Sequence, residues 1–142
     1  MKTYCHKVQY YETDGMRITH HSNYVRFMEE ARTDCLEQIG WSYKKFEEEG
    51  IVSPVVSVTC NYKKPTTYAD CIMVNVELLE LKKIKFKVGY TMTVNDEVVF
   101  TGTSVHCFMD RNGQPVNLES QYPEFYNKLL ELKKIDKKVL TK

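Results

Sequence analysis

The sequence has almost no net charge and no long hydrophobic run. Its 20 basic and 19 acidic side chains leave a formal net charge of +1 over 142 residues, which argues against a nucleic-acid partner. The basic cluster near the C-terminus is interpreted as a solvated helix end: Lys133, Lys134, Lys137, Lys138 and Lys142. No stretch approaches the roughly 18–20 apolar residues of a membrane span, and the polar N-terminus lacks a signal pattern. We therefore expect a cytoplasmic protein with no membrane partner.

The cysteines are spread too widely along the sequence to indicate a metal site or a disulfide framework. The five cysteines are Cys5, Cys35, Cys60, Cys71 and Cys107. Their odd number and the lack of a C-x-x-C pair argue against a zinc site or a disulfide framework. The adjacent pair His20 and His21 has no acidic or cysteine partner at ligand spacing, so no metal is expected there. We expect reduced thiols, mostly buried.

Linkers are missing as well. The chain has only four prolines and six glycines, with no low-complexity stretch and no internal repeat. A hydrophobic content of 42% in 142 residues is enough for one core. The sequence therefore predicts a single domain over residues 1–142.

Most of the chain alternates between apolar and polar residues, which is typical of strands with one buried face. The clearest alternation places Phe86, Val88, Tyr90 and Met92 on one face. The predicted strands are Thr3–Tyr11, Val56–Tyr62, Ile72–Leu78, Ile84–Val94 and Val98–Met109. Because four of them follow one another directly, the sheet is expected to be antiparallel.

Helical periodicity occupies three segments. The long helix is predicted over His21–Ile39, with Ser22 or Asn23 as its cap. Its apolar stripe consists of Tyr24, Phe27, Met28, Ala31 and Cys35. A short helix over Ser42–Glu49 and a last one over Tyr122–Ile135 complete the set. Only the long helix can cover the sheet early in the chain, so the fold class is α+β.

A carboxylate lies just before the long helix. Asp14 stands in a polar loop, seven residues before His21. Unpaired N–H groups and the positive end of the helix dipole converge at a helix N-terminus. A carboxylate that faces such donors suits acyl transfer, because one group attacks or activates water and the other stabilises an oxyanion. Asp14 could otherwise be a plain turn or cap residue.

The chain resembles the hotdog-fold acyl-CoA thioesterases of the 4-hydroxybenzoyl-CoA thioesterase type. The resemblance is carried by a tyrosine and an acidic residue before Thr-Asp, then His-x-x-Tyr and Glu-x-Ala-Arg. These residues are Tyr11, Glu12, Thr13, Asp14, His21, Tyr24, Glu29, Ala31 and Arg32. The resemblance covers nearly the whole chain and implies an antiparallel sheet wrapped around a long central helix.

The resemblance implies the site and its chemistry. Asp14 would be the nucleophile or general base, and the backbone N–H at His21 would polarise the thioester carbonyl, with Tyr24 at the substrate. Sister families place the carboxylate on the helix, where Glu29 and Glu30 are the comparable residues, but we interpret both as surface residues. Coenzyme A would be part of the substrate, with no separate cofactor and no metal.

Basic residues are expected at the nucleotide end of coenzyme A. The resemblance places such residues at the turn that carries Lys82 and Lys83, and lysine suits phosphate as a point charge. Lys63 and Lys64 form a second pair before Pro65. His106 next to Cys107 suggests a Cys–His pair, but we interpret their adjacency as coincidence, because neighbouring residues on a strand face opposite sides.

The expected function is therefore hydrolysis of acyl-CoA to a carboxylate and free coenzyme A. Two alternatives stay open: a non-catalytic acyl-thioester-binding or assembly protein, and a hotdog hydratase acting on enoyl-thioesters. A curled sheet leaves edge strands exposed, and exposed edges pair unless blocked. A homodimer or homotetramer with shared sites is therefore expected. The acyl group, and coenzyme A against a carrier protein, are left open by the sequence.

Overall fold

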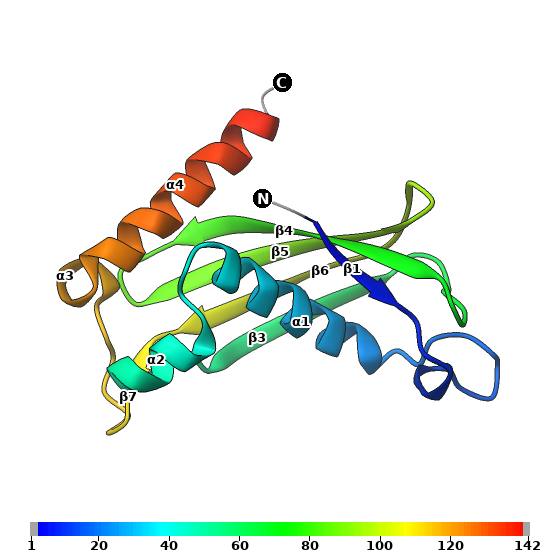
Figure 1. Cartoon of the computed structure of the whole chain (residues 1–142), viewed down its shortest axis with the longest axis horizontal. Coiled ribbons are helices and arrows are strands. Elements are labelled where there is room, and N and C mark those ends of the chain that lie inside the picture. The colour runs from blue at the N-terminus through cyan, green and yellow to red at the C-terminus, as the bar shows by residue number, and fades with distance from the viewer. Residues whose placement is uncertain (1–2, 141–142) are drawn as a thin grey trace.

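The computed structural model shows one antiparallel sheet wrapped around one long helix (Figure 1). It describes residues 3–140, with side chains through 133, so most of the predicted C-terminal basic cluster lies outside the described side chains. The five-stranded sheet has the order β1-β4-β5-β6-β3. Its strands are β1 (Tyr4–Lys7), β3 (Val55–Tyr62), β4 (Cys71–Leu81), β5 (Lys85–Val94) and β6 (Glu97–Cys107). The predicted α+β class and hotdog arrangement are confirmed.

The remaining elements are helices and one small ribbon. The helices are η1 (Tyr10–Glu12), α1 (Asn23–Gln38), α2 (Tyr43–Glu49), α3 (Leu118–Gln121) and α4 (Pro123–Leu140). A two-stranded ribbon, not predicted from the sequence, pairs β2 (Ile51–Val52) with β7 (Met109–Asp110). Figure 1 shows α1 lying across the sheet and α4 at one end of it.

The core lies between α1 and the inner face of the sheet. The predicted helix stripe is buried, from Tyr24 to Cys35, and so are alternate residues of β4 and β5 such as Val74 and Met92. Apolar residues of α4, among them Leu129, pack beside the end of α1. The strand and helix periods in the sequence therefore identified the buried faces of α1, β4 and β5, whereas the alternating apolar residues of β3 are exposed.

The first predicted strand is too long. β1 ends at Lys7, and η1 follows, because the Glu12 carboxylate accepts the Gln9 N–H at 2.8 Å and turns the chain. Consequently Tyr10 and Tyr11 are 78% and 80% exposed rather than aligned on a strand.

The helix cap also differs from the prediction. Ser22 occupies the N-cap of α1 but makes no capping hydrogen bond through its side chain. The Asn23 side chain instead donates to the Glu12 carbonyl at 2.9 Å. The start of α1 is therefore held by a tertiary contact, which sequence patterns cannot reveal.

Strand β3 forms one edge of the sheet. It pairs with β6 on one side, and in the described part of the chain no strand pairs with its other side. Apart from half-buried Cys60, all of β3 is exposed, including Val55, Val56, Val58 and Tyr62. An apolar edge strand of eight residues is a ready template for pairing with another chain.

The strand register defines two ends of the sheet. Tyr62 of β3 lies opposite Phe100 of β6, near the start of that strand. At the far end, Val55 lies opposite His106, and Cys107 lies opposite Lys85 of β5. The turn with Lys82 and Lys83 precedes Lys85, so it lies at the Val55 end.

Candidate active site

The loop between η1 and α1 is folded tightly around Asp14. Thr13 and Thr19 form a bridge that closes it. The Asp14 N–H donates to the Ile18 carbonyl at 2.9 Å, and the Asp14 carboxylate accepts the Met16 N–H at 2.8 Å. Arg17 has a φ of 65°, a left-handed conformation that few non-glycine residues adopt. The second carboxylate oxygen receives no hydrogen bond from any described residue.

Glu12 anchors both ends of this loop. Its side chain is 5% exposed, and Oε1 accepts from the Gln9 N–H and lies 2.8 Å from Nε2 of His6. Its carbonyl oxygen accepts the His20 N–H at 2.8 Å and the Asn23 side chain. The acidic residue of the motif therefore positions the loop rather than the substrate.

A cavity of about 350 Å³ opens beside the loop, and five of the seven predicted site residues line it. These are Asp14, His21, Tyr24, Lys63 and Lys64. The other lining residues are Met16, Ile18, Thr19, Tyr62 and Pro65. We call this the first cavity. It joins the loop, the start of α1 and the end of β3.

The backbone N–H of His21 lies just before α1, whose N-cap is Ser22, and makes no hydrogen bond with any described residue. The His21 carbonyl accepts the Tyr62 hydroxyl at 3.2 Å. The Tyr24 hydroxyl is 2.9 Å from Oγ1 of Thr66, which is 2.6 Å from Oγ1 of Thr19. Burial raises the pKa of Tyr24, so it stays a neutral phenol.

The two lysine pairs lie at opposite ends of the sheet. The N–H groups of Lys63 and Lys64 both donate to the Val99 carbonyl, at 2.9 and 3.0 Å. The Lys64 ammonium also pairs with Glu97. Lys82 and Lys83 are exposed in the turn at the Val55 end, away from Asp14 of the same chain. One chain alone therefore does not unite all the predicted residues.

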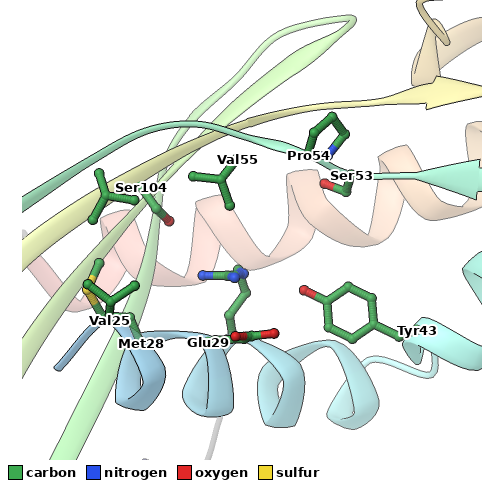
Figure 2. A pocket seen from close by; sticks show the side chains of 10 residues that line it. Val25, Met28, Glu29, Tyr43, Ser53, Pro54, Val55 and Ser104 are labelled. Carbon is green, nitrogen blue, oxygen red and sulfur yellow. The ribbon is translucent and has the colours of Figure 1, made fainter. Parts of the chain in front are cut away.

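A second cavity, of about 360 Å³, lies between α1 and the start of β3, and the sequence did not predict it. Figure 2 shows the labelled side chains of Glu29, Tyr43, Ser53 and Ser104 around it. Arg32 also lines it, together with Val25, Met28, Pro54, Val55 and Val58.

A series of hydrogen-bonded polar side chains leads from half-buried Arg32 in this second cavity to buried residues of the sheet. Nη1 of Arg32 donates to the Tyr90 hydroxyl at 2.9 Å, which is 2.7 Å from Oγ of Ser104. Oγ of Ser104 is 2.6 Å from Nε2 of His106. Burial, with the Arg32 charge as a smaller cause, lowers the pKa of His106 to about 4, so the ring is neutral at pH 7.

The spacing of residues along the chain gave a partial indication of this series of hydrogen-bonded side chains. Ser104 and His106 are two apart on a strand and so share a face. Arg32 lies four residues after Met28, on the apolar stripe of α1. Tyr90 belongs to another strand, and no local pattern connects it to Arg32.

Metal ligands are not gathered anywhere in the described chain: no group of three or more His, Cys, Asp or Glu residues could hold an ion. In the described chain no two cysteines form a disulfide, but only Cys35 is buried: Cys60 and Cys107 are half-buried, and Cys5 and Cys71 are exposed, so the prediction of mostly buried thiols is wrong. Among the described residues, no helix is long and apolar enough to cross a membrane.

Comparison with known proteins decides the family. The profile of the thioesterase-like superfamily matches residues 8–139. This chain belongs to the thioesterase-like superfamily. The predicted enzyme class, a thioester hydrolase, is thereby confirmed.

Individual relatives support this family assignment. The Bacillus subtilis protein YneP is 31% identical over 130 residues, which are 90% of this chain and 94% of YneP. The 1,4-dihydroxy-2-naphthoyl-CoA hydrolase of Thermosynechococcus vestitus is 25% identical over 126 residues, covering 87% of this chain and 86% of that enzyme. A crystal structure of an Aquifex aeolicus protein superposes with a TM-score of 0.84 at 35% identity, covering 89% of this chain and 98% of that one.

Proposed function

We propose that this thioesterase hydrolyses acyl-CoA, with Asp14 as nucleophile or general base and the His21 N–H as the group that polarises the thioester carbonyl. The observation that carries the proposal is the first cavity, which is lined by Asp14, whose side chain is half-buried, and by His21, whose N–H makes no hydrogen bond with a described residue and lies just before the 16-residue helix α1. The naphthoyl-CoA substrate in the name of the Thermosynechococcus vestitus enzyme supports a CoA thioester.

The chemistry follows from these two groups. Attack on the thioester carbonyl puts negative charge on its oxygen, and an N–H at a helix N-terminus stabilises that charge. Asp14 either attacks the carbonyl carbon itself or takes a proton from the attacking water. The C–S bond then breaks, and the coenzyme A thiolate leaves and is protonated.

Substitution of Asp14 by Asn tests this assignment. The change removes the charge but keeps an oxygen that can accept the Met16 N–H. We expect kcat to fall by at least ~10²-fold, the scale of general acid–base groups, measured as thiol release from a panel of acyl-CoAs. Asp34→Asn is the matched control, because the Asp34 carboxylate accepts a hydrogen bond from Gln38 on the same helix at 2.7 Å and lines neither cavity.

The assay also separates the alternatives. A folded Asp14→Asn protein with near-normal turnover would overturn the assignment of Asp14. An unmodified protein that binds acyl-CoA without releasing thiol would favour the binding-protein alternative. Hydration of an enoyl-CoA without thiol release would favour the hydratase.

We further propose that two chains pair through β3. The strand is an exposed apolar edge, and antiparallel pairing about its centre, near Val58 and Thr59, would set Val55 opposite the partner subunit's Tyr62. The Val55 end of one sheet would then adjoin the first cavity of the other chain. Lys82 and Lys83 of one chain would lie at the same end of the joint sheet as the partner subunit's Asp14.

This arrangement gives the lysine pairs distinct roles. Lys63 and Lys64 would contribute from the chain that carries Asp14, and Lys82 and Lys83 from its partner. Both pairs would act on the phosphates of coenzyme A as point charges. Two such dimers could associate further into a tetramer.

A further inference from the structure

We infer that the second cavity receives the acyl group and selects acyl groups that carry a carboxylate at their far end. The inference rests on the proposed function, because it assigns a substrate class to the same reaction. The evidence is the charge and hydrogen-bonding state of Arg32, together with the apolar walls around it.

Arg32 is a half-buried cation without an anionic partner among the described residues. Its described contacts are the neutral hydroxyls of Tyr90 and Tyr43, and no described carboxylate pairs with it. Its Nε is buried and has no hydrogen-bond partner among the described residues. A buried charge is normally paired, so Arg32 has donors to offer a ligand.

A second buried donor lines the same cavity. The hydroxyl of Ser53 is buried and, like Nε of Arg32, has no partner in the described chain. The Tyr43 hydroxyl points toward the cavity in Figure 2. One guanidinium and two hydroxyls thus surround one space, a set that matches the acceptor oxygens of a carboxylate.

The remaining walls suit an apolar stem. Val25, Met28, Pro54, Val55 and Val58 line the cavity beside these donors. A volume of about 360 Å³ lies at the lower end of the range for small-molecule sites. The cavity therefore fits an acyl chain or ring that ends in an anionic group.

Glu29 places a negative charge at the same cavity, which opposes the binding of an anion. It lines the cavity as well, but its side chain is exposed, so water screens its charge. Arg32 lies further into the protein, where its charge acts in a lower dielectric. At the buried end of the cavity, the charge of Arg32 therefore outweighs that of Glu29 and favours binding of an anion. At the cavity mouth, Glu29 disfavours it.

The proposed dimer connects this cavity to the reaction centre. Within one chain the two cavities lie at opposite ends of β3, because Val55 borders the second and Tyr62 the first. Seven residues of strand separate them, about 23 Å. Antiparallel pairing of β3 places the second cavity of one chain beside the first cavity of the other, within reach of one acyl-CoA.

The test compares adipyl-CoA with hexanoyl-CoA, which share a six-carbon acyl chain and differ in the terminal carboxylate. We expect kcat/KM to favour adipyl-CoA by at least tenfold in the unmodified protein. Arg32→Gln should abolish this preference, and Arg32→Lys should keep part of it. Glu29→Gln is the matched control from the same helix and cavity, and it should raise the preference or leave it intact.

Two outcomes would overturn the inference: a preference for hexanoyl-CoA in the unmodified protein, or an Arg32→Gln protein that loses both activities equally. If Arg32→Gln does not fold, the double change Ser53→Ala and Tyr43→Phe should lower the preference in its place. Calorimetric binding of both thioesters to Asp14→Asn protein adds a readout free of turnover. If the unmodified protein hydrolyses neither thioester but binds adipyl-CoA more tightly than hexanoyl-CoA, the cavity assignment is supported and the proposed function fails.

Discussion

At the scale of single residues, the side chains that position the two cavities are polar, and most of them are buried. Glu12 holds the loop of Asp14, and Thr66 holds Tyr24 and Thr19. Arg32 is linked through the hydroxyls of Tyr90 and Ser104 to His106, near the end of β6 that lies opposite Val55. Each of these groups loses its water on folding, so its hydrogen bonds are costly to break. They hold the Asp14 loop and Tyr24 in place at the first cavity and Arg32 at the second.

His106 makes stability depend on pH. Its pKa of about 4 in the folded protein lies below the ordinary value of 6.5, so between these values the unfolded chain binds more protons. The free energy of unfolding therefore falls on acidification through this window. From pH 7 to 4.5, this group should cost about 2–3 kcal/mol, measured by urea unfolding.

Comparison with His106→Gln isolates the contribution. Glutamine does not titrate, and its side-chain oxygen can still accept a hydrogen bond from Ser104. The variant should lose less stability than the unmodified protein over the same pH range. Equal losses would show that His106 ionises in the folded state as easily as in the unfolded one.

At the scale of elements, the contact between β3 and β6 depends on a missing side chain. A Cβ at Gly102 would lie 2.7 Å from the Thr59 carbonyl oxygen of β3 and 2.8 Å from the ring of Phe100. Phe100 is fully buried, so its ring cannot move aside freely. The spacing of the edge strand therefore depends on glycine.

Gly102→Ala should destabilise the protein by about 1–3 kcal/mol, as overpacking does, in urea unfolding. Gly15→Ala is the matched control, because nothing lies within 4 Å of its added Cβ and its φ is ordinary. It should change stability by less than about 0.5 kcal/mol. Similar values for both variants would refute the close approach at Gly102.

At the scale of the whole molecule, the exposed edge of β3 predicts association. Light scattering should give at least twice the chain mass of 16.7 kDa. Val56→Lys combined with Val58→Lys should shift the protein toward a single chain, because charged edge residues block strand pairing. Val98→Lys, at an equally exposed valine on β6, should leave the mass unchanged. A fully active monomer at micromolar concentration would contradict the dimer.

Mixed dimers test whether the sites are shared. A chain with Asp14→Asn is mixed with a chain carrying Lys82→Ala and Lys83→Ala. If each site uses Asp14 of one chain and the lysines of its partner, the hybrid contains one intact site. Activity should then rise above that of either parent after subunit exchange. Subunit exchange without recovery of activity would be consistent with a dimer but would refute the shared site.

The sequence predicted most of the helices and strands and the two groups, Asp14 and His21, that we propose as reactive. Period-two alternation identified the buried faces of β4 and β5, and the stripe from Tyr24 to Cys35 identified the buried face of α1. These patterns are local, because each follows from the repeat of one element. Asp14 and His21 were also found locally, since the loop joins directly onto the helix that they flank.

Only the tertiary structure decided what distant segments do together. Lys63 and Lys64 reach the first cavity because β3 runs beside the start of α1, whereas Lys82 and Lys83 lie at the other end of the sheet. The cavity around Arg32 is lined by residues of α1, α2, β3 and β6 and of the segment between β2 and β3, and Tyr90 of β5 accepts a hydrogen bond from Arg32. Such contacts depend on strand order and register, which side-chain periodicity does not encode. A residue's partners across the sheet are therefore set by folding as a whole.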